Sequence, residues 1–244
     1  MARQSAPATP VLLTRARADG EAFAAALTAR FGGKVRPVVA PLIAPRFLTP
    51  VIPDRDYAAV VFTSAQAVEA ARRLGISLPS LAWCVGRKTA AAASASGFHA
   101  RSADGDAKTL ADAILKNPPD GRILYLRGVD IRGNLLEKLE FAGVDIDVAV
   151  VYAQEPRPLA AEALALVTTP HDLIVPLFSP RSADLFRAAL PPDTAARLHL
   201  AAMSTAVADA LAGLPRAALA IARHPDAPAM LEAVESLLAA LPAP

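Results

Sequence analysis

The sequence has a single cysteine, no long apolar run and little net charge, and each shortage excludes a class of protein. Cys84 is alone among 244 residues, so no disulfide can form within the chain. We expect Cys84 to be buried in a strand and the protein to be cytoplasmic. Because no run of about 18 apolar residues occurs, no transmembrane helix is expected. The net charge of +2 argues against a dedicated nucleic-acid binder.

Several signature motifs are also missing. The chain has no Walker loop, no Gly-x-Gly-x-x-Gly, no nucleophile elbow and no Ser-His-Asp signature. Residues 1–10 lack the apolar core of a signal peptide, and we expect a ragged terminus there. No metal-ligand spacing relates the four histidines, each of which we expect on the surface or in a loop: His99, His171, His199 and His224. An enzyme with this sequence would act mainly through positioning and electrostatics.

What the sequence does contain is an internal repeat. Three units recur in the same order, at an offset of 112 residues for Arg15 and Arg127 and 116 for Phe62 and Phe178. In the third unit, Val85 of the first copy corresponds to Met203 of the second, at an offset of 118 residues. Offsets that drift so little indicate duplication with small insertions. We expect two similar halves that face each other across a ligand cleft.

Short apolar runs alternate with helix-like stretches along the chain. This alternation predicts an α/β fold with parallel sheets covered by helices on both faces. The expected buried strands are residues 11–14, 60–63, 82–85, 123–126, 173–178 and 198–203. Prolines bar residues 35–43 from a helix and from a central strand, and Pro176 predicts an edge, a bulge or shortened pairing in its strand. Ser64, Ser179 and Asp226 are placed to cap helices.

The residues that follow the expected strands share one chemistry. Small hydroxyl residues and glycine stand there at helix N-termini, where free N–H groups and the helix dipole favour anions. They are Thr14, Thr63, Ser64, Gly86, Thr89, Gly128, Ser179, Ser182, Ser204 and Thr205, with the basic residues Arg15, Lys88, Arg127, Arg132 and Arg181 nearby. Any one hydroxyl could be only a helix cap, and Arg15 and Arg127 could be ordinary surface charges. Together they predict a site for a ligand with several carboxylates or phosphates.

Four segments, in this order and spacing, resemble the uroporphyrinogen-III synthase family. They read FTSAQAV at residues 62–68, VGRKTA at 85–90, VVY at 150–152 and FSPRSA at 178–183. The resemblance covers about residues 11–238. It implies two flavodoxin-like lobes joined by a two-stranded β-ladder, whose strands would be the stretch near residues 35–45 and the run ending at Tyr152. The first lobe would comprise residues 1–39 plus 156–244, and the second residues 40–155.

The resemblance also implies a reaction. The family closes linear hydroxymethylbilane, which carries eight carboxylates, to uroporphyrinogen III. It inverts ring D through a spirocyclic pyrrolenine and expels water. No metal or organic cofactor, nucleic acid or membrane is implied. The resemblance favours a monomer that could contact the hydroxymethylbilane-forming enzyme transiently.

Tyr152 matches a tyrosine that the family places in its cleft. We expect its hydroxyl to assist departure of the leaving hydroxide as a hydrogen-bond donor, although Tyr152 could instead be an aromatic that packs one lobe. The resemblance implies carboxylate binding at Thr63, Ser64, Gly86, Thr89, Ser179 and Ser182. From the strand-end pattern, we add Arg15, Arg127, Gly128, Arg181, Ser204 and Thr205 as substrate-binding residues.

One position departs from the family pattern. In the second copy of Gly-x-x-Thr, Ser204 replaces the glycine and Val207 the threonine. This puts the site of the first lobe in doubt and predicts either compensation by Thr205 or reduced activity. Two rival interpretations remain open. One is a non-catalytic module that binds tetrapyrroles or polycarboxylates, and the other is an α/β enzyme acting on sugar phosphates or nucleotides.

Overall fold

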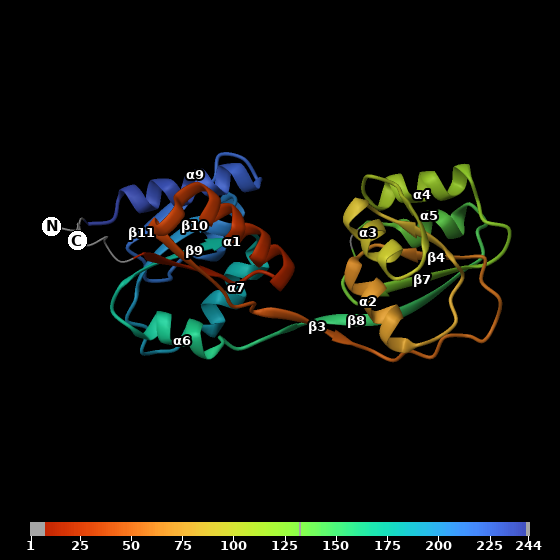
Figure 1. Cartoon of the computed structure of the whole chain (residues 1–244), viewed down its shortest axis with the longest axis horizontal. Helices are drawn as coiled ribbons and strands as arrows, with labels where there is room; N and C mark the ends of the chain where they lie inside the picture. The colour runs from red at the N-terminus through yellow and green to blue at the C-terminus, as the bar shows by residue number, and fades with distance from the viewer. Residues whose placement is uncertain (1–7, 132, 243–244) are drawn as a thin grey trace. The chain divides into compact units, whose positions relative to one another are not determined.

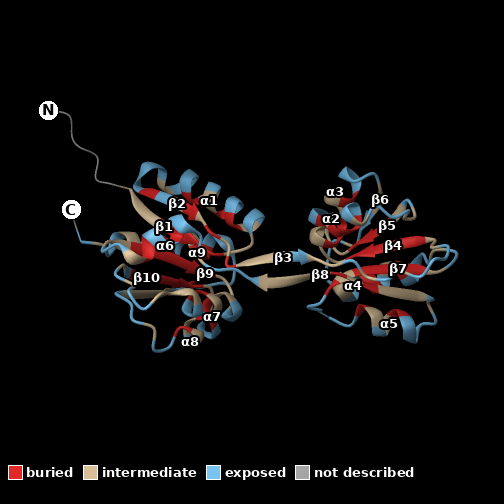
Figure 2. Ribbon diagram, turned by 90° about the horizontal axis from the view of Figure 1, so that it is seen from below, coloured by how far each residue is buried: buried red, intermediate tan, exposed pale blue. Residues whose placement is uncertain are grey.

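The computed structural model describes residues 8–131 and 133–242. The chain divides into two compact units. Unit 1 contains Met1–Ala44 and Pro156–Pro244, and unit 2 contains Pro45–Glu155. Each unit is a largely parallel sheet with helices on both faces, and its central strands are buried (Figures 1 and 2).

Unit 1 is built on a sheet with the strand order β11-β10-β9-β1-β2. The strands are β1 (Thr9–Leu13), β2 (Val35–Val39), β9 (Asp172–Leu177), β10 (Arg197–Ala202) and β11 (Ala218–Ile221). Helices α1 (Arg17–Phe31) and α9 (Ala227–Ala239) pack on one face, through Phe23, Leu27 and Met230. Helices α6 (Ala161–Thr168), α7 (Pro180–Ala189) and α8 (Thr205–Ala210) pack on the other, through Phe186 and Val207.

Unit 2 is built on a sheet with the order β3-β8-β7-β4-β5-β6. Its strands are β3 (Ile43–Phe47), β4 (Ala59–Phe62), β5 (Leu81–Cys84), β6 (His99–Ser102), β7 (Ile123–Gly128) and β8 (Ile146–Pro156). Helices α2 (Ala65–Leu74) and α3 (Arg87–Ala95) contribute Val68 and Ala93 to the core on one face. Helices α4 (Ala107–Lys116) and α5 (Leu135–Phe141) contribute Leu110 and Leu139 on the other.

The two sheets repeat one topology. Numbered along the chain, the order β2-β1-β9-β10-β11 of unit 1 is the 2-1-3-4-5 order of a flavodoxin-like sheet. The five parallel strands of unit 2, in the order β8-β7-β4-β5-β6, take the same places when β7 and β8 are counted first, because in the chain these two strands follow β4, β5 and β6. Unit 1 combines β1–β2 from the first copy of the sequence repeat with β9–β11 from the second copy, and unit 2 combines β7–β8 from the second copy with β4–β6 from the first. The predicted fold class, two flavodoxin-like α/β units, is therefore confirmed.

The chain crosses between the units twice, along β3 and β8. The amide of Leu48 donates to the carbonyl of Val151, and the amide of Arg157 donates to the carbonyl of Leu42. From the first bond to the second, the residue number falls on the β3 side, from 48 to 42, and rises on the β8 side, from 151 to 157, so the two strands are antiparallel. The expected first ladder strand was placed wrongly in part, because β2, with Pro37, belongs to the sheet of unit 1. Pro37 is tolerated there because β2 is an edge strand.

Pro176 lies in a central strand, so the expectation of an edge is wrong. β9 pairs with β10 from Asp172 to Leu177, whereas its register with β1 is given by Val11 and Ile174 alone. The shortened pairing expected beside the proline is thus present on the β1 side.

His199 is also not where the sequence pattern placed it. It lies in β10, is buried, and its Nε2 is 2.8 Å from Oδ1 of Asp172 on the neighbouring strand. Cys84 is buried at the end of β5, as expected, and burial raises the pKa of its thiol to about 11. No helix in the described part of the chain is long and apolar enough to cross a membrane.

Candidate functional site

The candidate site lies at the carboxyl ends of the strands. Each unit has its own set of these strand ends, which we call its carboxyl edge. In unit 2, Thr63 and Ser64 follow β4, Gly86 follows β5, and Arg127 and Gly128 end β7. Tyr152 lies on the adjacent strand β8, directly opposite Gly128 in the register. Because parallel strands end at the same edge, these residues come together there, as ligand-binding residues do in open α/β sheets.

The Tyr152 ring rests on the backbone of Gly128. A methyl group at Gly128 would lie 2.6 Å from Cζ of the tyrosine and 2.9 Å from its hydroxyl oxygen. The amide of Val129 donates to the carbonyl of Tyr152 at 2.9 Å. The half-buried ring also packs against the core shared with α2 and α3. The hydroxyl of Tyr152 is therefore held at the carboxyl edge of unit 2.

A second tyrosine, which the sequence did not single out, lies in the same edge. The hydroxyls of Tyr125 and Thr63 are 3.2 Å apart, across the β4–β7 pair. Burial raises the pKa of Tyr125, so its phenol is neutral at ordinary pH and can donate. Thr63 is thereby positioned by a buried partner from another strand.

The helix N-termini of unit 2 follow the sequence prediction. The Ser64 hydroxyl caps α2 by accepting a bond from the amide of Gln66 at 3.1 Å, and the Gln66 side chain in turn accepts a bond from Gln154 on β8. Gly86 caps α3 without a side chain, and Thr89 is buried three residues further on. The amides at these two N-termini face the carboxyl ends of the strands and are the kind of donor that suits an anion.

The side chain of Arg127 folds back along the backbone that follows it, at the end of β7. Its Nη1 donates to the carbonyls of Gly128, at 2.9 Å, and Val129, at 3.4 Å. Its Nε is buried, and no group among the described residues accepts a hydrogen bond from it. The guanidinium thus lies beside the Gly128–Tyr152 contact. Lys88 is exposed at the start of α3, and Arg132 lies outside the described residues.

In unit 1, Thr14 and Arg15 follow β1. The guanidinium carbon of Arg15 lies 3.8 Å from the ring centre of Phe178, which follows β9, and its Nη2 is 3.9 Å from Asp19. Partial burial lowers the pKa of Arg15, and Asp19 opposes this effect. The aromatic contact fixes the arginine at the carboxyl edge while it remains charged.

Ser179 and Ser182 form a reciprocal cap on α7. The Ser179 hydroxyl accepts a bond from the Ser182 amide at 3.1 Å, and the Ser182 hydroxyl accepts one from the Ser179 amide at 3.0 Å. Ser179 caps the helix, as predicted, Pro180 takes the first helical position, and Arg181 follows it at the exposed surface. Both hydroxyls therefore serve the helix itself, which competes with carboxylate binding by the same oxygens.

Ser204 and Thr205 begin α8 after β10. Ser204 occupies the N-cap position without a side-chain bond in the described structure, and Thr205 is exposed. Val207 stands three residues after the N-cap, as Thr89 does in α3, and its side chain is buried in the core of unit 1. The methyl groups of Val207 thus belong to the apolar core rather than to the edge.

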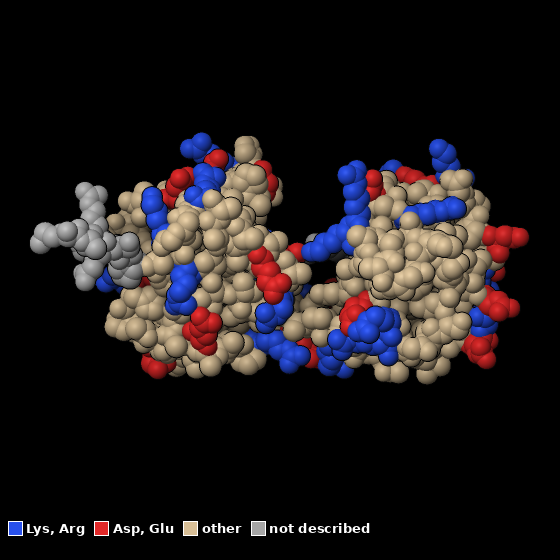
Figure 3. Space-filling model, viewed as in Figure 1, with Lys and Arg blue, Asp and Glu red and all other residues tan. Residues whose placement is uncertain are grey.

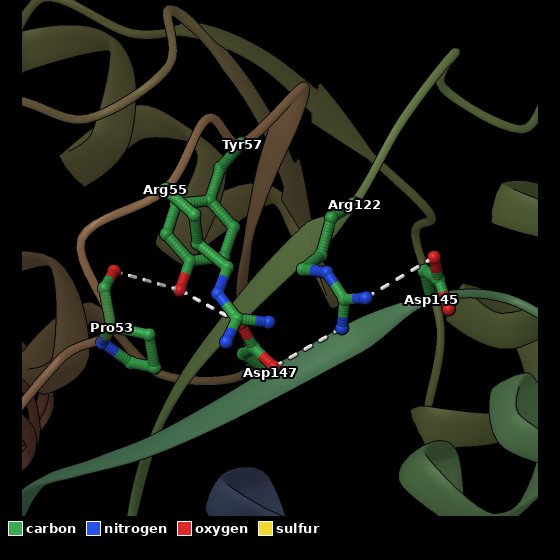
Figure 4. A network of polar contacts seen from close by, with 6 residues as sticks. All are labelled: Pro53, Arg55, Tyr57, Arg122, Asp145 and Asp147. Atoms are coloured by element: carbon green, nitrogen blue, oxygen red, sulfur yellow. Dashed lines mark hydrogen bonds and ion pairs between the residues drawn. The ribbon is translucent and has the colours of Figure 1, made fainter.

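The amino ends of the strands carry different polar groups, which are paired with one another. In unit 2, Asp147 accepts a hydrogen bond from Tyr57 at 2.9 Å and pairs with Arg122 at 3.2 Å and Arg55 at 3.5 Å (Figure 4). Arg122 also pairs with Asp145. Burial and the bond to Asp147 raise the pKa of Tyr57 to about 12. This network ties the start of β7 to the start of β8 and lies at the end of the sheet away from Tyr152.

Basic side chains are spread over the drawn surface of each unit rather than gathered in one block (Figure 3). Among the described residues, no group of three His, Cys, Asp or Glu side chains could hold a metal ion. The chemistry that these edges offer is hydrogen bonding and charge: hydroxyls, helix amides and arginines.

Solved structures of known proteins match the chain over nearly its whole length. Uroporphyrinogen-III synthetase from Helicobacter pylori 26695 has a TM-score of 0.58 and 19% identity, over 94% of this chain and 99% of that one. A mutant uroporphyrinogen III synthase from the extremely thermophilic bacterium Thermus thermophilus has a TM-score of 0.44, 20% identity and coverages of 95% and 99%. Another Thermus thermophilus uroporphyrinogen III synthase has a TM-score of 0.36 and 18% identity, over 94% of this chain and 99% of that one.

Comparison with family models gives a match that does not depend on the fold alone. The model described as "Uroporphyrinogen-III synthase HemD" matches residues 21–232. No curated protein matches the chain. The family match spans both units and contains the Tyr152, Gly128 and Ser179 positions described above. The chain therefore belongs to the uroporphyrinogen-III synthase family.

Proposed function

We propose that this protein is a uroporphyrinogen-III synthase. It converts linear hydroxymethylbilane to uroporphyrinogen III, with inversion of ring D and loss of water. The family match over residues 21–232 carries this proposal. The carboxyl edges support it, because each offers donors suited to carboxylates and the substrate has eight of these groups.

In this proposal the strand ends of each unit supply groups that bind substrate carboxylates. The helix amides behind Ser64 and Gly86 supply neutral donors in unit 2, and those behind Ser179 supply them in unit 1. Arg15, held against Phe178, supplies positive charge. Thr63, Thr89, Arg127, Arg181, Ser182, Ser204 and Thr205 stay proposed contacts of the same kind.

The chemistry needs few protein groups. The pyrrole nitrogen of ring A pushes electrons toward its hydroxymethyl carbon, so the C–O bond breaks readily. We propose that the Tyr152 hydroxyl donates a hydrogen bond to the departing hydroxide. The former hydroxymethyl carbon of ring A then bonds to the substituted carbon of ring D, and rearrangement of the spirocyclic pyrrolenine inverts that ring. The proton that ring D loses on final closure combines with the hydroxide, so the leaving group is released as water. Spontaneous closure gives the uninverted type I isomer, so the protein controls regiochemistry, without metal or organic cofactor and as a monomer.

A coupled assay tests the function. Porphobilinogen and a hydroxymethylbilane-forming enzyme are mixed with the protein, and the oxidised uroporphyrin isomers are separated by chromatography. The proposal predicts predominantly type III. Type I alone, as in the mixture without the protein, would overturn the enzymatic assignment. Binding of linear or cyclic tetrapyrrole without closure would then identify a binding module instead.

A further inference from the structure

We propose that Gly128, together with an irregularity in strand β8, is the device that positions the Tyr152 hydroxyl for the reaction. Gly128 is then a positioning residue rather than a substrate-binding one. The inference rests on the proposed function, because it concerns the tyrosine to which that function assigns a hydrogen bond. It follows from the register of two neighbouring strands and from the space above one glycine.

The first observation is a break in the pairing of β7 with β8. Leu126 is opposite Ala149 and Arg127 is opposite Val150, but Gly128 is opposite Tyr152. Strand β8 therefore contains one extra residue, Val151, at this point. Such bulges are uncommon between parallel strands, and they change the direction of the side chains that follow.

The bulge changes the face on which Tyr152 lies. Side chains alternate along a regular strand, so Ala149 and Val151 would share one face and Tyr152 would take the other. In the structure, Val151 and Tyr152 both pack against the core shared with α2 and α3. If β8 continued in regular register past Val150, Val151 would lie opposite Gly128, and the phenol of Tyr152 would point to the opposite face of the sheet.

The second observation is that the Tyr152 ring occupies the space directly above Gly128. A methyl group on Gly128 would lie 2.6 Å from Cζ, 2.8 Å from Cε2 and 2.9 Å from the hydroxyl oxygen of Tyr152. Real side chains essentially never come this close, so any larger residue would displace the ring. The phenol end of Tyr152, and not its backbone, occupies the space that a side chain at position 128 would need.

Backbone conformation does not require the glycine. The left-handed glycines are Gly32, Gly75, Gly97, Gly121, Gly133, Gly143 and Gly213, and Gly128 is not one of them. Alanine can therefore adopt the backbone conformation at this position without strain. The ring of Tyr152 can swing away by rotation about its side-chain bonds, so a Gly128→Ala protein is expected to fold with the phenol displaced.

Kinetics of Gly128→Ala, Tyr152→Phe and the double variant test the inference. The matched control is Gly33→Ala, because a methyl group there meets nothing within 4 Å and Gly33 is not left-handed. A displacement of the phenol by about 1 Å predicts a kcat of Gly128→Ala lower by about a hundredfold, with KM little changed. In the Tyr152→Phe background, where no hydroxyl is left to position, the same glycine substitution should cost no further kcat.

A direct readout of the Tyr152 position distinguishes failure of this inference from failure of the proposed function. The chain has only three tyrosines, so protein labelled with carbon-13 at the tyrosine Cζ gives three assignable signals. Gly128→Ala should move the Tyr152 signal, whereas Gly33→Ala should move none. If the native protein makes no type III isomer, the proposed function fails. A shifted Tyr152 signal would still support the claim that Gly128 positions the Tyr152 ring.

Three results would overturn the inference. The first is a Gly128→Ala protein with native kcat, and the second is an unmoved Tyr152 signal. The third is a loss that adds in full to that of Tyr152→Phe, because it would show that Gly128 acts through something other than the hydroxyl. A thermal unfolding midpoint close to native confirms that each variant is folded before its kinetics are read.

Discussion

Asp172 stabilises unit 1 in a pH-dependent way that can be worked out from its partners. Its Oδ1 lies 2.9 Å from Nε of Arg197 and 2.8 Å from Nε2 of His199, and its side chain is only 18% exposed. The hydrogen bonds from Arg197, and then that from His199, lower the pKa of Asp172 from 3.8 to about 2. The carboxylate is thus favoured in the folded state over the unfolded one.

The sign and size of the effect follow from this pKa. Because the folded pKa lies below the unfolded one, the stabilisation is complete above about pH 4 and disappears as the pH falls toward about 2. A lowering of nearly two pKa units corresponds to about 2 kcal/mol, and solvent screening at the exposed Arg197 reduces it to about 1–2 kcal/mol. For a chain of this length, the loss of about 1–2 kcal/mol from the free energy of unfolding lowers the melting temperature by about 2–8 °C.

The test is the unfolding of Asp172→Asn and of the native protein in urea at several pH values. The free-energy difference should be about 1–2 kcal/mol near pH 6 and should narrow as the pH falls below about 4. Asp184→Asn is the control, since Asp184 forms an exposed pair with Arg187 and should change stability by less than about 0.5 kcal/mol. Equal stability of the Asp172 variant and the native protein near neutral pH, or a difference that does not change with pH, would refute the reasoning.

Three further substitutions have defined expectations. Tyr152→Phe should lower kcat by about a hundredfold with KM nearly unchanged, because it removes the proposed donor and keeps the ring; native turnover would remove that role. Ser182→Ala should cost about 1 kcal/mol of unfolding free energy, because the Ser179 amide loses its acceptor in the cap; an unchanged urea midpoint would contradict it. Val207→Thr should cost about 1–3 kcal/mol without raising kcat, because the new hydroxyl would be buried in the core and not face the edge as a ligand; a gain in activity would show that this interpretation of Val207 is wrong.

The strands and caps that carry strong local signals could be predicted from the sequence. Continuous apolar runs identified β4, β7 and β9, and Ser179-Pro180 identified the start of α7. The edge strands β6 and β11 were missed because neither has a buried pattern: His99–Ser102 is largely exposed, and Ala218–Ile221 is only partly buried. Their pairing with β5 and β10, rather than their own composition, makes them strands.

Contacts between distant residues limited the prediction of the site. Tyr125 reads in sequence as a core aromatic, and only the β4–β7 register brings its hydroxyl to Thr63. His199 reads as a surface residue because its partner, Asp172, is on another strand. Gly128 was expected to contact substrate, whereas its clearest relation in the structure is to the Tyr152 ring, through a bulge that no local pattern reveals.

The central claim is most directly tested by the isomer composition of uroporphyrin as the protein concentration is raised at constant hydroxymethylbilane supply. Spontaneous closure and the protein compete for the same substrate. The account predicts that the type III fraction rises with native protein until it dominates, and that heat-denatured protein leaves only type I. A product that stays type I at every concentration of folded protein would contradict it.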